Sequence, residues 1–396
     1  MASSRSAHER FLASGYFPAL DGLRCVAVSA VMFHHSTARP LPGWVGRGHL
    51  GVQLFFCISG FLITTLLLRE RRTSGRISLR RFWIRRSLRI FPLYYAVLAL
   101  FTLFTALASD GHARSQFFSN LPFFASYTGN WWASYAAAHP VIFGFSWSLA
   151  TEEQFYLLWP PLLKAVRRVP LALFALLFLL AFDQWAERGG LRFAFSPHGW
   201  VERVVTSFSS SIALGSVLAL ALEHSAGRAL AKLFAQRAAL PLFACLALAL
   251  VVRPVEPFLC FELTLACLVA AAALGENRIL SSAPLVFVGR KSYGMYLFHV
   301  PVIGALRWLF PSFSGSPGAL FATAFGLTLA LASASHRWFE LPFLRLRASF
   351  GAAGSSMGVA RGSTTRQGVT IGPGALASGF AEEPTAMLEL NRARVD

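Results

Sequence analysis

The sequence predicts an all-α membrane protein, a polytopic bundle of about ten transmembrane helices. Two observations favour this fold class: 55% of the residues are hydrophobic while only 14% are charged, and the apolar residues gather in long blocks. A soluble domain carries more surface charge than this, whereas a block of about 20 apolar residues can cross the hydrocarbon core as a helix. The predicted spans have the approximate bounds 18–38, 50–69, 90–109, 146–166, 169–186, 203–223, 239–253, 257–275, 292–311 and 318–340.

The chain divides into three segments. Residues 1–16 are polar and are expected to form a flexible cytoplasmic arm. Residues 17–347 form the transmembrane domain, in which nine or eleven spans remain alternatives because the fourth block is short and the seventh is marginal. Residues 348–396 are rich in Gly, Ala and Ser and lack apolar periodicity, which is typical of a disordered tail. We expect this tail to be cytoplasmic and no second folded domain to follow the membrane core.

The charge pattern predicts the orientation of the helices. The chain has 36 Lys and Arg against 18 Asp and Glu, a net charge of +18. In a soluble protein this excess would suggest nucleic acid, but here the basic residues concentrate in alternate loops, above all in loop 69–89. Because positive loops face the cytoplasm, we expect both termini to be cytoplasmic in a multi-pass protein of the cell (inner or plasma) membrane. The basic loops would face anionic membrane lipid, and no nucleic-acid partner is expected.

The cysteines give no sign of a metal site. All five fall within predicted spans, where we expect them to be small buried hydrophobes. They form no CxxC pair and show no His/Cys spacing suited to a metal ion, so no metal is expected. The sequence leaves the oligomeric state open.

Arg24 and His35 lie inside the first predicted span, FPALDGLRCVAVSAVMFHHS. Ionisable groups in a membrane helix are costly and mark functional sites. Their separation of eleven residues is about three helical turns, so both project from one face, about 16 Å apart. A neutral imidazole can take a proton from a hydroxyl, which makes His35 a candidate general base. The alternative is that the histidines only occupy the polar boundary of the membrane.

A second candidate site lies in the arginine-rich loop that ends RRFWIRRSLRIFPLYY. Arg86 and Arg89 are spaced i and i+3, which makes them neighbours on a helix. Paired guanidiniums suit phosphate or pyrophosphate, so the spacing favours a phosphate-bearing cytoplasmic ligand. The alternative is that this charge only faces lipid headgroups.

A third candidate is the segment SWSLATEEQFYLLWP at the fourth predicted span. Ser148, Glu152 and Tyr156 are four residues apart and lie close to one helix face. A carboxylate at membrane depth needs a cationic or hydrogen-bonding partner, and His35 and Arg24 are the candidates for Glu152. The alternative is an interfacial helix whose carboxylates stay in water.

Three further residues are expected to support the site. His34 follows its neighbour in the first span at about 100° around the helix, and Glu153 adjoins the third candidate segment. His299 lies deep in the ninth predicted span, within SYGMYLFHVPV. A lone histidine in an aromatic helix more often packs through a hydrogen bond, so His299 is counted as a supporting residue only.

Taken together, these segments resemble the acyltransferase-3 family of integral-membrane O-acyltransferases over about residues 17–347. Arg24 and His35 match the family's Arg-x10-His motif, and Arg86 and Arg89 match its Arg-x-x-Arg motif. Its Ser-x3-Glu-x3-Tyr motif and further signatures resemble SWSLATEEQFYLLWP, GVQLFFCISGFLI, SYGMYLFHVPV and RWFELPF. Small departures occur at Cys57 and Ala150. Some members carry a fused extracytoplasmic esterase-like domain, which is not expected here, so the membrane core would complete the transfer itself.

The resemblance implies transfer of an acyl group, usually acetyl, from cytoplasmic acyl-CoA to a hydroxyl of a glycan or a glycosylated small molecule. Arg86 and Arg89 would hold the CoA phosphates. His35 would act as general base, with Glu152 as the residue that orients it. Arg24 would stabilise the developing oxyanion or hold the pantetheine arm. Hydrogen-bonding and supporting roles would fall to Ser148, Tyr156, Glu153, His34 and His299.

Two other classes of function remain open. A transporter or flippase of a lipid-linked or glycosylated substrate would also suit ten helices with intramembrane charge. Such proteins use broken helices at the membrane midplane, a pattern that the sequence does not show. A signalling or scaffold membrane protein would use the basic loop only to contact lipid.

Overall fold

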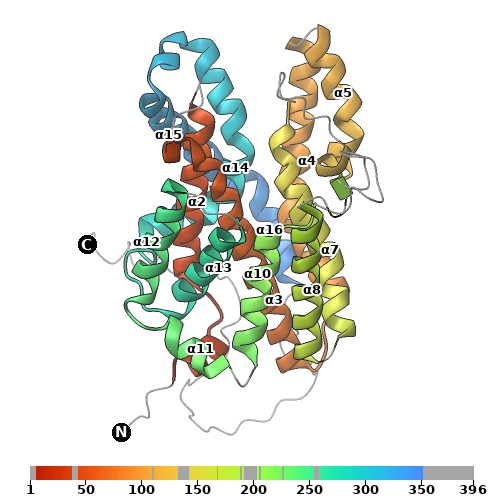
Figure 1. The fold of residues 1–396 in the computed structure, drawn as a ribbon. Coiled ribbons are helices and arrows are strands. Elements are labelled where there is room, and N and C mark those ends of the chain that lie inside the picture. The colour runs from red at the N-terminus through yellow and green to blue at the C-terminus, as the bar shows by residue number, and fades with distance from the viewer. Residues whose placement is uncertain are drawn as a thin grey trace, which may run out of the picture.

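The computed structural model confirms the all-α prediction, because every regular element among the residues it describes is a helix (Figure 1). It describes residues 6–37, 43–108, 111–132, 142–166, 168–187, 190, 203–204, 207–224, 227–253 and 258–350. Most of the predicted tail, from residue 351 on, lies outside these ranges. The main helices are α1 (Ala7–Ala13), α2 (Pro18–Ser36), α3 (Gly51–Ser74), α4 (Leu79–Ala108), α5 (Gly111–Ala125), α6 (Gly129–Trp132), α7 (Trp147–Ala165), α8 (Val169–Glu187), α10 (Ser210–Glu223), α11 (Gly227–Phe234), α12 (Ala239–Val252), α13 (Leu259–Leu274), α14 (Ala283–Leu309), α15 (Pro317–Ser335) and α16 (Leu341–Ala348).

Several of these helices are long and apolar enough to cross a membrane. Among the described residues four qualify, Val45–Ser74, Leu79–Ala108, Val169–Ala186 and Pro317–Ala348. The number rises to six if two sharply bent pairs, α1 with α2 and α11 with α12, each count as one span. α10 and α13 are apolar but have only 14 and 16 residues, which is short for a full crossing. Ten spans and two cytoplasmic termini therefore stay predictions.

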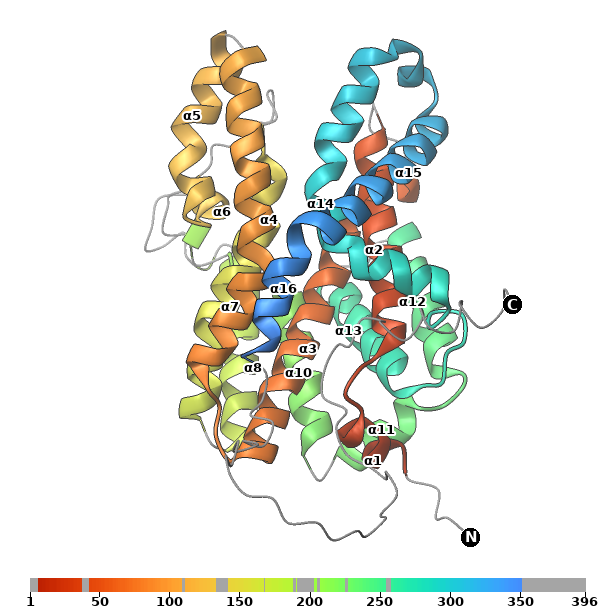
Figure 2. The same ribbon diagram turned by 180° about the vertical axis from the view of Figure 1, so that it is seen from behind.

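The helices form two groups joined by a central pair. α2, α14 and α15 stand together on one side, and α4, α5, α7 and α8 stand on the other (Figures 1 and 2). α3 and α10 pack against each other between the groups. α16 follows α15 and packs on α4 (Figure 2). A site that draws on α2, α4, α7 and α14 can therefore form only where the two groups meet.

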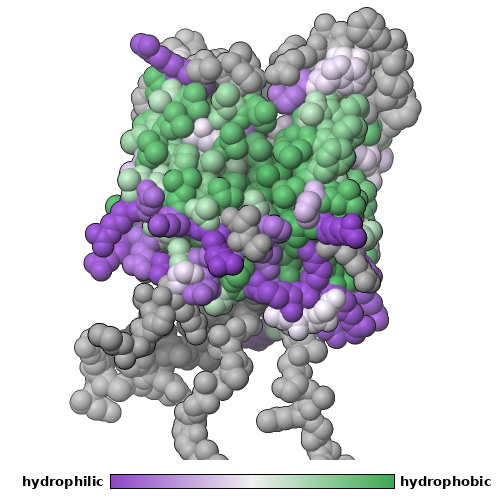
Figure 3. All heavy atoms as spheres, turned by 60° about the horizontal axis from the view of Figure 1, so that its bottom comes forward, coloured by the Kyte–Doolittle hydropathy of each residue, from purple (hydrophilic) through white to green (hydrophobic). Residues whose placement is uncertain are grey.

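One end of the bundle is strongly polar. Figure 3 shows apolar side chains over the flank of the molecule and a band of hydrophilic side chains toward the end that carries α1 and α11 in Figure 1. We call this the basic end, because Arg71 and Arg72 lie in the last turn of α3 there, and Lys232 lies in α11. An apolar flank with a basic margin is the surface expected of a membrane protein.

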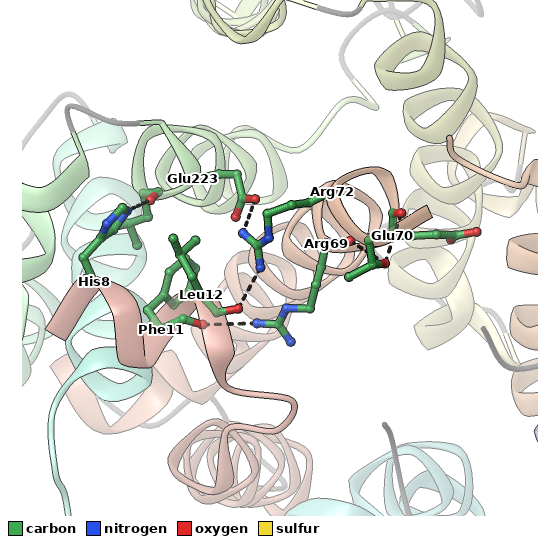
Figure 4. A network of polar contacts seen from close by, with 9 residues as sticks. His8, Phe11, Leu12, Arg69, Glu70, Arg72 and Glu223 are labelled. Atoms are coloured by element: carbon green, nitrogen blue, oxygen red, sulfur yellow. Dashed lines mark hydrogen bonds and ion pairs between the residues drawn. The ribbon is translucent and has the colours of Figure 1, made fainter. Parts of the chain in front are cut away.

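Within the segment expected to be a flexible arm, the described residues form helix α1. Ser6 and Glu9 build a capping box at its start. Arginines of α3 satisfy the carbonyl groups at its end, because Arg69 Nη2 donates to Phe11 O at 3.3 Å and Arg72 Nη2 donates to Leu12 O at 2.7 Å (Figure 4). Helix carbonyls at a C-terminus lack intrahelical partners, so these bonds hold α1 against the bundle.

The same network joins α10 to the basic end. Arg72 Nη1 lies 2.5 Å from Glu223 Oε1 at the end of α10, and His8 Nε2 lies 2.7 Å from Leu222 O (Figure 4). His8 is buried in this contact. Three segments far apart in the sequence, α1, α3 and α10, are thus connected through Arg72.

Glycines allow the central helices to approach closely. A Cβ atom on Gly289 of α14 would lie 1.8 Å from Asp21 O of α2, and one on Gly215 of α10 would lie 2.2 Å from Cys57 O of α3. Lipid tails give no hydrophobic force between helices, so such close backbone packing is a main source of association in membranes. Gly289 therefore sets the distance between α2 and α14.

We predict that Gly289→Ala destabilises the protein by about 1–3 kcal/mol, because the new methyl group would overlap backbone atoms that cannot move aside. Gly304→Ala on the same helix is the matched control, since a Cβ there meets no atom within 4 Å. That substitution should be neutral or raise stability by up to about 1 kcal/mol through helix propensity. Thermal unfolding in detergent measures both, and equal melting temperatures would contradict the packing account.

Candidate functional site

A partly open pocket lies where α2, α3, α4, α7 and α14 meet. Seven residues singled out from the sequence line it together, although they come from three helices. They are Arg24 of α2, Arg86 and Arg89 of α4, and Ser148, Glu152, Glu153 and Tyr156 of α7. The pocket therefore joins three of the predicted motifs into one site.

Three arginines and two glutamates, Glu152 and Glu153, line the pocket, which leaves a formal excess of one positive charge. Arg24, Arg86 and Arg89 all line it, and Arg347 of α16 lies close enough to Arg89 to repel it electrostatically. The guanidinium of Arg86 stacks on the Tyr156 ring at 4.2 Å from its centroid, a cation–π contact. Its Nε atom is buried and has no hydrogen-bond partner among the described residues. Buried polar groups normally have partners, so this pocket is suited to an anionic ligand.

Arg24 is held at the pocket by an acidic residue one turn earlier on α2. Arg24 Nη1 lies 3.0 Å from Asp21 Oδ1, and Tyr16 donates a hydrogen bond to the other oxygen of Asp21 at 2.5 Å. Arg290 of α14 approaches the same carboxylate at 3.8 Å. Asp21 is only 5% exposed, so a buried carboxylate positions Arg24 and ties α2 to α14.

Glu152 faces this pocket rather than His35. Its carboxylate accepts a hydrogen bond from Ser59 at 2.8 Å and one from Tyr156 at 3.2 Å. Arg86 and Arg24 are the cations whose charges act on it. Glu152 is predicted from the sequence to orient His35, but no hydrogen bond or ion pair joins the two in the described part of the chain. The reason is geometric, since the pocket lies at the depth of Arg24, about three helical turns from His35.

Ser148 connects α7 to α14. Its hydroxyl lies 2.7 Å from the hydroxyl of Tyr296, which also donates to Phe145 O at 3.0 Å. Tyr296 lines the pocket, and its ring centroid lies 5.4 Å from that of His299. Tyr296 therefore stands between the arginine pocket and the next group of polar residues.

That next group is a pair of histidines near the far end of α2. His35 Nδ1 lies 3.2 Å from His299 Nε2 and 3.0 Å from Val31 O. Arg307 of α14 donates to the carbonyl oxygen of His35 at 3.0 Å. His299 is fully buried. The structure thus places His299, expected only to support the site, directly beside the candidate base.

His34 takes a different direction from its neighbour. Its Nδ1 lies 2.9 Å from Gly46 O, and its ring lies 5.1 Å from that of His49. This contact connects α2 to the segment before α3. Among the described residues no group of three or more His, Cys, Asp or Glu side chains could hold a metal ion.

Several residues of the site were missed by the sequence analysis. Asp21 and Tyr296 had a usable signal, since each is spaced three residues from a chosen residue, Arg24 and His299 respectively. Ser59 and Arg347 had none, because only the folded bundle brings α3 and α16 to the pocket. The arrangement as a whole offers an anion-binding pocket and, at another depth, an imidazole pair suited to proton transfer.

Comparison with known proteins gives a consistent result. The chain matches the sequence model of the acyltransferase domain over residues 17–337. A candidate O-acetyltransferase of Staphylococcus aureus (strain COL) is 29% identical over 354 residues, which are 83% of this chain and 57% of that protein. The peptidoglycan O-acetyltransferase of Listeria monocytogenes (serovar 1/2a, strain EGD-e) is 28% identical over 348 residues, 73% of this chain and 49% of that protein.

A candidate peptidoglycan O-acetyltransferase of Bacillus subtilis (strain 168) is 31% identical over 323 residues, again 73% of this chain and 49% of that protein. The chain thus spans about half the length of the curated relatives it matches. No solved structure gives a significant match.

Proposed function

Because this chain belongs to the acyltransferase-3 family, we propose that it is a membrane-bound O-acyltransferase. It moves an acyl group, acetyl in the simplest case, from acyl-CoA to a hydroxyl of a glycan or glycosylated small molecule. The observation that carries the proposal is the pocket in which three guanidiniums of α2 and α4 meet. The names of the relatives, O-acetyltransferases of peptidoglycan among them, support acetyl as the group and a glycan as the acceptor.

The arginine pocket binds the donor in this proposal. Coenzyme A carries a pyrophosphate and a further phosphate, and planar guanidiniums bind such groups through two parallel hydrogen bonds. The buried, unpartnered Nε of Arg86 would complete its hydrogen bonding on the phosphates. Arg24 holds the pantetheine arm, because the acyl carbonyl must reach His35 about 16 Å away. Glu152, which Ser59 and Tyr156 hold through hydrogen bonds, balances part of the charge of Arg86.

The histidine pair performs the proton transfer. His35 takes the proton of the acceptor hydroxyl as the oxygen attacks the acyl carbonyl carbon. The carbon–sulfur bond then breaks, and the proton passes to the departing thiolate of coenzyme A. Since His35 and Arg24 lie about 16 Å apart along one face of α2, the pantetheine arm must extend from the arginine pocket toward the histidines. The basic end is cytoplasmic in this proposal, and the protein lies in the cell membrane with both termini inside.

We predict that His35→Ala abolishes acyl transfer while leaving expression and membrane insertion normal. The reason is that the acceptor hydroxyl loses its base, which contributes about 10²–10⁴-fold to rate. Purified protein, labelled acetyl-CoA and candidate glycan acceptors measure this directly. His112→Ala is the control, because His112 is exposed on α5. Near-normal transfer by His35→Ala would remove His35 from the mechanism. If neither the wild-type protein nor the variant turns over acetyl-CoA with any acceptor, the result would favour a transporter.

We predict that Arg86→Gln and Arg89→Gln each weaken acetyl-CoA binding roughly tenfold to a hundredfold, since a charged hydrogen bond contributes about 1.5–3 kcal/mol. Arg81→Gln is the matched control, because Arg81 is exposed on the same helix and does not line the pocket. Calorimetric titration of the donor measures all three. If all three variants bind acetyl-CoA with equal affinity, the arginines do not bind the donor and would serve only to contact lipid headgroups.

A further inference from the structure

We propose that His299 is a positioning residue that, together with the backbone carbonyl of Val31, fixes the tautomer of His35, so that Nδ1 of His35 carries the proton and Nε2 presents its lone pair to the acceptor. This inference rests on the proposed role of His35 as general base. The hydrogen bonds that the two imidazole rings make to backbone carbonyl groups identify the nitrogen of His35 that reacts.

The protonation of His299 follows from its own helix. Its Nδ1 lies 2.5 Å from Tyr296 O. A carbonyl oxygen can only accept, so Nδ1 of His299 is the donor in this contact. In a neutral imidazole one nitrogen donates and the other accepts, so Nε2 of His299 carries a lone pair. The ring is fully buried, and Phe145 packs on it with ring centroids 5.6 Å apart, which limits its rotation.

The protonation of His35 follows from that of His299. Nδ1 of His35 has two neighbours, Nε2 of His299 at 3.2 Å and Val31 O at 3.0 Å. Both are acceptors, so a proton on Nδ1 satisfies either contact. The opposite assignment would set the lone pair of His35 Nδ1 against the Val31 carbonyl and that of His299 Nδ1 against the Tyr296 carbonyl. Two backbone oxygens therefore select one arrangement, and Nε2 of His35 is left as the basic nitrogen.

This arrangement suits the base in both of its charge states. When Nε2 of His35 takes the hydroxyl proton, an N–H bond forms as the O–H bond breaks, and the ring becomes an imidazolium. Its Nδ1–H continues to donate to His299 Nε2, which therefore stabilises the positive charge without moving. A histidine base whose partner fixes its tautomer depends strongly on that partner.

The position of His299 is itself tied to the arginine pocket. Tyr296, three residues earlier on α14, bonds through its hydroxyl to Ser148 and to Phe145 O. Ser148 and Tyr296 both line the pocket. The residues around the proposed donor site thus hold the helix turn that carries His299.

Two substitutions of His299 separate this role from simple packing. The amide oxygen of Gln reaches the place of Nε2, so His299→Gln can still accept from His35. The shorter Asn keeps only the place of Nδ1, so His299→Asn can bond to Tyr296 O but not to His35. We expect His299→Gln to retain most of kcat and His299→Asn to lose about tenfold or more, as for one lost hydrogen bond, with the KM for acetyl-CoA unchanged in both. Equal kcat values in the two variants would overturn the proposal.

A second measurement holds even if His299→Asn does not fold. Solid-state NMR of the full-length wild-type protein and His299→Gln, labelled with ¹⁵N at histidine, reports the tautomer, and His35→Ala identifies the signals of His35. We expect the Nδ1–H form of His35 in both proteins, and an Nε2–H form would contradict the inference. The readout does not depend on activity. If His35→Ala retains full transfer, the proposed function fails whatever the spectrum shows; if it abolishes transfer while His35 is Nε2–H, only the present inference fails.

Discussion

The close contact between α2 and α14 is the constraint on which the rest of the site depends. Gly289 lets the backbone of α14 lie directly on that of α2, and each helix then contributes residues to both functional groups. Arg24 and Tyr296 line the pocket, while His35 and His299 form the pair beyond it. In lipid, two helices associate through close van der Waals packing rather than through the hydrophobic effect. One added methyl group at Gly289 would therefore disturb both the pocket and the histidine pair.

Charge in the interior explains why the pocket has its present composition. Cations at membrane depth are costly unless they pair or face a water-filled cavity. Asp21 and Glu152 neutralise part of the positive charge of Arg24 and Arg86. The charges that act most strongly on Arg89 are those of other arginines, which repel it. A cluster of cations that is compensated only in part is costly in the empty protein and is stabilised when an anionic ligand binds. The residual positive charge is therefore the feature that the proposed donor would use.

Much of the site could be predicted from the sequence because its motifs are local. Helical spacing alone placed Arg86 beside Arg89 and Glu152 beside Tyr156, and the structure brings both pairs into one pocket. Contacts between helices could not be predicted in the same way. The pairing of His35 with His299 and the turn of Glu152 toward Ser59 depend on how α2, α3, α7 and α14 pack, which no spacing within one helix reveals. The all-α fold class could also be predicted from the sequence. The number of membrane spans could not, because α10 and α13 are apolar but short.

In the proposed mechanism, the donor phosphates and the reacting hydroxyl lie at different depths of one path and are connected by the pantetheine arm. A cryo-electron microscopy structure of the protein with a non-reactive acetyl-CoA analogue tests it most directly. We expect the phosphates at Arg86 and Arg89, the pantetheine arm passing Arg24, and the acyl carbonyl extended past Tyr296 toward Nε2 of His35. Phosphates bound away from these arginines, or an acyl group pointing away from the histidine pair, would contradict it.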